Sequence, residues 1–216
     1  MREVVWAVIG LLSGWRAFFL AQKDVLRLRT TGETFGAGQS THRDSLSIVI
    51  AISSSALWWQ TARVYTGDFT VLSIGLLIAV GLRLVLIDID THLLPSNIVF
   101  RACALTFPLL VIATVVDDTG SLAGMCFGAV ALWCCMKVLA FLSRGDLGGG
   151  DVTLSLLLGM YLGWMSWERM FTAVVTAFAA AGVFALVLLA MGRAGRRTHF
   201  AFGPFLIAGT LFAVLR

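Results

Sequence analysis

Two observations predict an all-α fold, a polytopic membrane helix bundle. Hydrophobic residues make up 59% of the 216-residue chain and charged residues 13%, whereas a soluble domain carries about a quarter charged residues. The apolar residues fall into long runs without strand-like alternation, and a helix is one of the two structures that can span a bilayer. We therefore expect one membrane-embedded domain over residues 1–216 with the lipid bilayer as its first partner.

Eight apolar segments are the expected membrane helices. They cover residues 4–22, 45–60, 69–88, 98–116, 121–142, 152–165, 170–191 and 201–215. The first segment lacks a clear cleavage site and is followed by basic residues, so we expect a retained span and not a signal peptide. Residues 23–44 are the one sizeable loop expected, and about 20 residues cannot build a core of their own.

Basic residues orient these segments. Eight of them follow the first, fifth and seventh segments: Lys23, Arg27, Arg29, Arg43, Arg144, Arg193, Arg196 and Arg197. The positive-inside rule places these loops in the cytoplasm and both termini outside. Trp58, Trp59, Trp164 and Trp167 then lie near the outer ends of the segments, where an aromatic belt is expected. The net charge of +4 is modest, so nucleic-acid binding is not predicted.

Two stretches place carboxylates where an apolar run meets a turn. Asp88 ends one segment, and Asp90, His92 and Pro95 follow it within a few residues. The run Gly148, Gly149 and Gly150 precedes Asp151, which opens the segment 152–165. Acidic residues at a membrane boundary are costly unless they have a function, and both stretches fall on the side that the basic residues assign to the cytoplasm.

A pair of carboxylates can hydrolyse a peptide bond without a metal or an organic cofactor. Two close carboxylates share one proton, so one can accept a proton from water while the other donates. Asp151 at a helix N-terminus is favoured as the anion, and Asp88 at a C-terminus is expected to hold the proton. The glycines would allow a tight turn and the close approach of another backbone, such as an extended substrate.

Other interpretations of the same residues remain open at this point. Asp90 competes with Asp88, and His92 is a possible auxiliary base or ligand. Asp90, His92 and Asp146 could together bind a divalent metal, although no second ligand set has suitable spacing, and the chain has no C-x-x-C pair. Each aspartate could also be a solvated boundary residue. From a different class, a small proton- or cation-coupled transporter would use buried acids, more often near mid-membrane than at helix ends.

At these residues the sequence resembles the type IV prepilin peptidases, membrane aspartic proteases of the Gly-x-Gly-Asp class. Their first motif, an aspartate followed after five residues by Leu-Pro, matches Asp88 with Leu94 and Pro95 and selects Asp88 over Asp90. Their second motif matches Gly148 to Asp151. Further similarity lies in Leu162-Gly163-Trp164 and Phe202-Gly203-Pro204-Phe205.

The resemblance implies a bacterial or archaeal cytoplasmic-membrane enzyme that cuts the basic leader from type IV prepilins or pseudopilins on the cytoplasmic side. Asp88 and Asp151 would be catalytic, with Leu94, Pro95 and the three glycines shaping the site. A presenilin-like protease, which cuts within membrane helices, shares Gly-x-Gly-Asp but fits the Leu-Pro motif less well. The zinc-binding domain of many members is expected to be replaced by residues 23–44, so S-adenosylmethionine is expected only if methylation of the product is retained.

Overall fold

The computed structural model describes residues 1–30, 43–91, 93–143, 148–192 and 202–216, and within these ranges the chain is helical, without a strand. Eight helices are described: α1 (Arg2–Thr30), α2 (Arg43–Val64), α3 (Asp68–Thr91), α4 (Ser96–Val116), α5 (Leu122–Leu142), α6 (Gly149–Met165), α7 (Trp167–Ala190) and α8 (Gly203–Leu215). Each contains one of the predicted apolar segments or most of it. The predicted helical bundle is therefore confirmed.

Five of the described helices, α1, α3, α4, α5 and α7, are long and apolar enough to cross a membrane, and α8 is a shorter apolar helix. The chain is a multi-pass membrane protein. Serine side chains cap the starts of two of these helices, α5 and α7. Ser121 accepts a hydrogen bond from the Gly124 N–H at 3.2 Å, and Ser166 accepts one from the Arg169 N–H at 3.2 Å. Pro95 stands at the N-cap of α4, where its missing N–H costs nothing.

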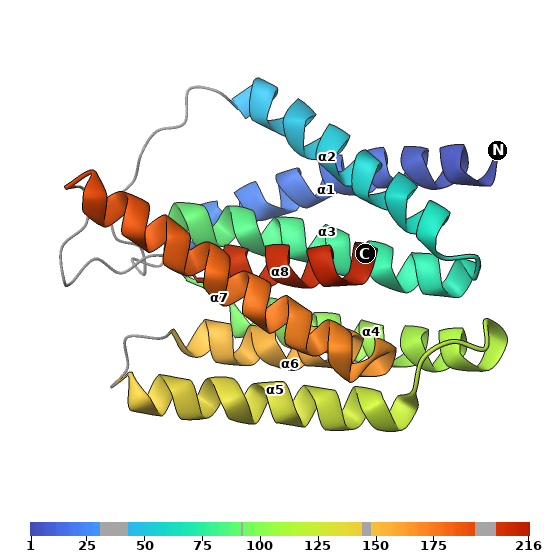
Figure 1. Ribbon diagram of the computed structural model, residues 1–216. Coiled ribbons are helices and arrows are strands. Elements are labelled where there is room, and N and C mark those ends of the chain that lie inside the picture. Colours follow the sequence, from blue (N-terminus) through green and yellow to red (C-terminus); the bar gives the residue numbers. More distant parts are fainter. Residues whose placement is uncertain (31–42, 92, 144–147, 193–201) are drawn as a thin grey trace.

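The helices run roughly side by side, and both termini lie toward the same end of the bundle (Figure 1). The C-terminal end of α3 and the N-terminal ends of α6 and α8 lie toward the opposite end (Figure 1). This alternation is what a chain crossing back and forth through a bilayer requires. It brings the two predicted carboxylate stretches to the same end of the molecule.

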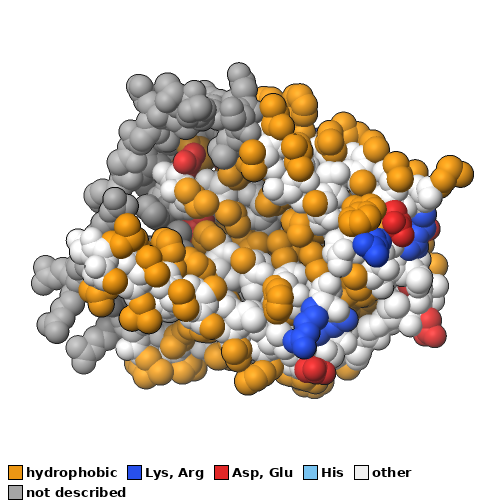
Figure 2. All heavy atoms as spheres, turned by 45° about the horizontal axis from the view of Figure 1, so that its top comes forward, with side chains coloured by type: hydrophobic (Ala, Val, Ile, Leu, Met, Phe, Trp, Pro, Cys, Tyr) orange, Lys and Arg blue, Asp and Glu red, His pale blue; other side chains and the backbone are white. Residues whose placement is uncertain are grey.

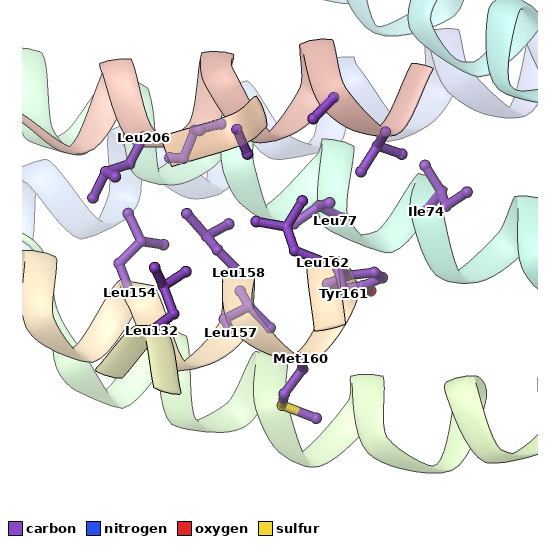
Figure 3. Close-up of a cluster of buried hydrophobic side chains, with 14 of the residues drawn as sticks. Ile74, Leu77, Leu132, Leu154, Leu157, Leu158, Met160, Tyr161, Leu162 and Leu206 are labelled. Atoms are coloured by element: carbon purple, nitrogen blue, oxygen red, sulfur yellow. The ribbon is translucent and has the colours of Figure 1, made fainter. Parts of the chain in front are cut away.

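Helix α6 forms the centre of the core. Most of its residues from Asp151 onward are buried. Leu158 and Leu162 lie on the side of Leu77 of α3, whereas Met160 points to the opposite side (Figure 3). A helix that is apolar all round belongs in the interior of a bundle, and most of α6 is buried from Asp151, in its first turn, onward.

Glycines bring α5 and α6 into direct backbone contact. A Cβ atom on Gly128 would lie 2.7 Å from the carbonyl oxygen of Gly159 and 2.5 Å from the Cα of Gly163. Small residues at helix interfaces in membranes allow this close approach, and dispersion contacts then stabilise the pair. Helix α6 thus lies directly against α5 and also packs against α4, α7 and α8, while Tyr161 donates a hydrogen bond to the carbonyl oxygen of Ser73 of α3 at 2.7 Å.

Helix α1 is longer than the sequence predicted. It continues through the basic stretch to Thr30, and α2 begins at Arg43. The expected loop over 23–44 is therefore too long at its start, and its central residues 31–42 lie outside the described ranges. Asp24 explains the extension, because its Oδ2 accepts hydrogen bonds from Nε and Nη2 of Arg83 of α3 at 2.9 and 2.6 Å.

The predicted aromatic belt is half right. Trp59 and Trp167 are exposed, but only 3% of Trp58 and 1% of Trp164 is exposed. Trp164 donates its indole N–H to Thr114 at 2.7 Å, and Trp58 stacks on Trp6 with ring centroids 5.6 Å apart. These two residues pack between helices and do not face lipid. Elsewhere hydrophobic side chains spread over the visible surface, with Lys and Arg gathered toward its right-hand side (Figure 2).

Candidate active site

Asp88 lies in the last turn of α3 and is buried, with 4% of the residue exposed. The helix ends three residues later, at Thr91. The hydroxyl of Thr91 donates to the carbonyl oxygen of Ile87 at 2.7 Å, and Ile87 itself is fully buried. The residue before the carboxylate is thus anchored in the core, which fixes the direction in which Asp88 leaves the helix.

Asp151 lies in the first turn of α6 and is also buried, with 7% of the residue exposed. Gly148 is the N-cap, and its carbonyl oxygen accepts the backbone N–H of Asp151 at 3.1 Å. Asp151 therefore precedes the apolar segment 152–165, as predicted. Its Oδ1 atom is buried and has no hydrogen-bond partner among the described residues.

The two carboxylates converge on one point of a third helix. A Cβ atom on Gly203, at the start of α8, would lie 2.7 Å from Oδ2 of Asp88 and 3.3 Å from Oδ1 of Asp151. These two distances limit the separation of the carboxylate oxygens to about 6 Å. The structure thus brings together the two residues that the sequence selected, although they lie on different helices.

Leu94 forms another wall of the site. A Cβ atom on Gly150 would lie 2.9 Å from the carbonyl oxygen and 3.2 Å from the Cα of Leu94. The backbone that approaches Gly150 is therefore that of Leu94 in the same chain, whereas the sequence interpretation suggested a substrate. Gly149 differs, because a Cβ atom there would meet nothing within 4 Å.

Burial, and after it the nearby charge of Asp88, raise the pKa of Asp151 from the ordinary carboxyl value of 3.8 to about 7. A change of this size corresponds to about 4 kcal/mol. A helix N-terminus favours an anion by only about 0.3–1 kcal/mol. Burial therefore outweighs the helix dipole at Asp151, and which of the two carboxylates is the anion of the pair stays a prediction.

The remaining predicted site residues differ in their exposure to solvent and in whether the structure describes them. Asp90 is exposed, unlike Asp88, so its carboxylate stays in contact with solvent. Pro95 is half-buried at the start of α4. His92 and Asp146 lie outside the described residues. Within the described ranges no group of three His, Cys, Asp or Glu side chains could hold a metal ion.

Gly203 is the site residue that sequence reasoning missed. The residues Phe202 to Phe205 resemble the family, but nothing in the sequence linked them to the carboxylates. The glycine followed by Pro204 at the start of an apolar run was the available signal, because such a pair often marks a helix start.

The fold and this site define a class: a multi-pass helical membrane protein with two buried aspartates meeting at helix ends. Residues 71–190, which include both carboxylate motifs, match the type IV leader peptidase family. The chain belongs to this family.

Curated relatives agree with the match. The chain is 32% identical over 176 residues to a prepilin leader peptidase/N-methyltransferase of Burkholderia pseudomallei, covering 76% of this chain and 53% of the relative. It is 30% identical over 145 residues to a protein of the same name from Bacillus subtilis, covering 67% and 54%. The chain thus spans about half the length of these relatives. No solved structure is significantly similar to it.

Proposed function

We propose that this protein is an aspartic endopeptidase that removes the short basic leader from type IV prepilins or pseudopilins. The observation that carries the proposal is the pair of buried carboxylates, Asp88 and Asp151, which lie within about 6 Å of each other beside Gly203. Family membership and the names of the relatives supply the substrate class. They also favour a peptidase over a transporter.

In the proposed reaction the pair holds one proton and binds one water molecule. The ionised carboxylate takes a proton from the water, whose oxygen attacks the carbonyl carbon of the scissile bond. The protonated carboxylate donates to the carbonyl oxygen, and the tetrahedral intermediate then collapses as the leaving amine gains a proton. The raised pKa of Asp151 favours its protonated form, which supports a proton held by the pair near neutral pH.

The position of the site at one end of the bundle supports a substrate that enters from the membrane surface. The basic loops favour the cytoplasmic side for this end, with both termini outside. A prepilin would then keep its apolar helix in the bilayer while its leader reaches the carboxylates. Leu94 borders the site. Together with Pro95 and the open side of Gly149, it is a proposed contact for the leader.

Coexpression with a candidate prepilin tests the proposal, with leader removal scored by a gel shift and enzyme levels checked by immunoblot. Asp88→Asn and Asp151→Asn should each abolish processing, because each removes one member of the pair. Asp90→Asn is the matched control, since Asp90 lies two residues from Asp88 but is exposed. Full processing by either variant of the pair, or loss confined to Asp90→Asn, would contradict the proposal.

The relatives are also named as N-methyltransferases, and the second activity is tested separately. We propose leader cleavage alone for this chain, with no requirement for S-adenosylmethionine in that step. Mass spectrometry of the mature pilin N-terminus should find a free amine. A product heavier by one methyl group, formed only when this chain is expressed, would assign methylation to it as well.

A further inference from the structure

Three side-chain atoms closely surround the position that a side chain of residue 203 would occupy. A Cβ atom there would lie 2.7 Å from Oδ2 of Asp88, 2.7 Å from Cδ1 of Leu94 and 3.3 Å from Oδ1 of Asp151. All three neighbours are side-chain atoms of the candidate active site. Gly203 lies outside the residues 71–190 that match the family.

Helix α8 has little freedom to move away from the carboxylates. Ile207 packs against α3, where a Cβ atom on Gly81 would lie 3.0 Å from its Cγ2. On another face, a Cβ atom on Gly209 would lie 2.6 Å from the carbonyl oxygen of Ala173 of α7. The helix is wedged between α3 and α7. A group added at residue 203 would therefore displace the carboxylates or Leu94 and not simply shift α8.

One of the atoms next to Gly203 is a buried polar atom without a hydrogen-bond partner. This atom is Oδ1 of Asp151, which makes no hydrogen bond with any residue in the described ranges. A buried carboxylate oxygen in this condition indicates a place for a reacting group or a water molecule, because leaving it unsatisfied is costly.

We propose that Gly203 is a positioning residue of the catalytic centre. Its missing side chain lets the N-terminus of α8 close against both carboxylates and hold them at the separation at which they share one proton and one water molecule. This inference rests on the proposed peptidase function. It adds a third helix, and a residue that is not itself titratable, to the reaction.

The test compares two glycine-to-alanine substitutions in α8. Gly203→Ala should lower kcat for prepilin cleavage about 100-fold with little change in KM, because a displacement of reacting groups by about 1 Å costs that much. Gly209→Ala is the matched control, because it crowds the backbone of α7 and is remote from the carboxylates. It should lower thermal stability but keep kcat. A Gly203→Ala enzyme with the wild-type kcat would overturn the proposal.

A companion variant keeps the test decisive if Gly203→Ala does not fold. Leu94→Ala removes one of the three crowded neighbours, and Gly203→Ala combined with Leu94→Ala retains the contacts with the two carboxylates. The double variant should still have a kcat about tenfold or more below that of Leu94→Ala alone; equal values would overturn the proposal. Activity in Asp88→Asn or Asp151→Asn would instead refute the peptidase function itself.

Discussion

Two adjacent glycines provide a sharp test of the site geometry, because only one of them is blocked. A Cβ atom on Gly150 would lie 2.9 Å from the carbonyl oxygen of Leu94, and one on Gly149 would meet nothing within 4 Å. The obstacle at Gly150 is backbone, which cannot rotate away as a flexible side chain can. Alanine at 150 therefore forces α6 and the turn at Leu94 apart, whereas alanine at 149 points into open space.

Only one of the two substitutions, Gly150→Ala, should lower the stability of the protein. Overpacking of this kind costs about 1–3 kcal/mol, partly offset by the helix propensity of alanine, which exceeds that of glycine by up to about 1 kcal/mol. For Gly149→Ala only the gain in helix propensity applies, because the added Cβ atom meets no neighbour. Since about 1 kcal/mol moves the Tm of a chain of this size by about 2–4 °C, Gly150→Ala should lower the Tm by several degrees and Gly149→Ala should leave it unchanged or raise it.

Thermal unfolding of both purified variants in one detergent, followed by prepilin cleavage, measures the difference. Gly150→Ala should also lower kcat, because Asp151 is the next residue and moves with the displaced turn. Equal Tm values for the two variants, or a larger loss for Gly149→Ala, would refute the packing of Gly150 against Leu94.

Three further predictions follow from the charges. The folded-state pKa of Asp151 is raised to about 7, so the folded protein binds more protons than the unfolded protein between about pH 4 and pH 7. Stability, measured as Tm against pH, should therefore fall as the pH rises through this window. Asp151→Asn should make the Tm less dependent on pH. Cleavage should likewise decline above about pH 7, as the pair loses its shared proton; a rate that keeps rising to pH 9 would exclude this. Asp24→Asn and Arg83→Gln should each lower the free energy of unfolding by about 1–3 kcal/mol, because each leaves a partly buried partner unpaired. A double variant that is no less stable than the worse single variant would show that the two residues act as a pair.

The sequence predicted most of the helix positions, because a bilayer forces every backbone polar group into internal hydrogen bonds and makes apolar runs a direct record of helices. It was less informative where polar residues belong to a helix. Residues 23–30 looked like a loop, but Asp24 finds its partner in Arg83 of α3, and only the packed structure brings these two together. The burial of Trp58 and Trp164 could not be predicted either, because it also depends on how the helices pack.

Within the candidate site, the resemblance to the family's first motif, which ends in Leu94 and Pro95, selected Asp88 over Asp90. The burial of Asp88 and the exposure of Asp90 are consistent with that choice. The roles of Gly150 and Gly203 could not be predicted, because their neighbours lie far away in the sequence. The raised pKa of Asp151 could not be predicted either. Helix ends can be read from a sequence, but the burial that outweighs them cannot.

A double-mutant cycle on the two carboxylates tests the central claim most directly. Purified wild-type protein, Asp88→Asn, Asp151→Asn and the double variant would be compared for prepilin cleavage under single-turnover conditions, with folding checked by Tm. Residues that act as one catalytic unit are strongly non-additive, so the double variant should be no slower than either single variant. Independent losses that multiply in the double variant, or a single variant that retains most of the wild-type rate, would contradict a shared-proton aspartate pair.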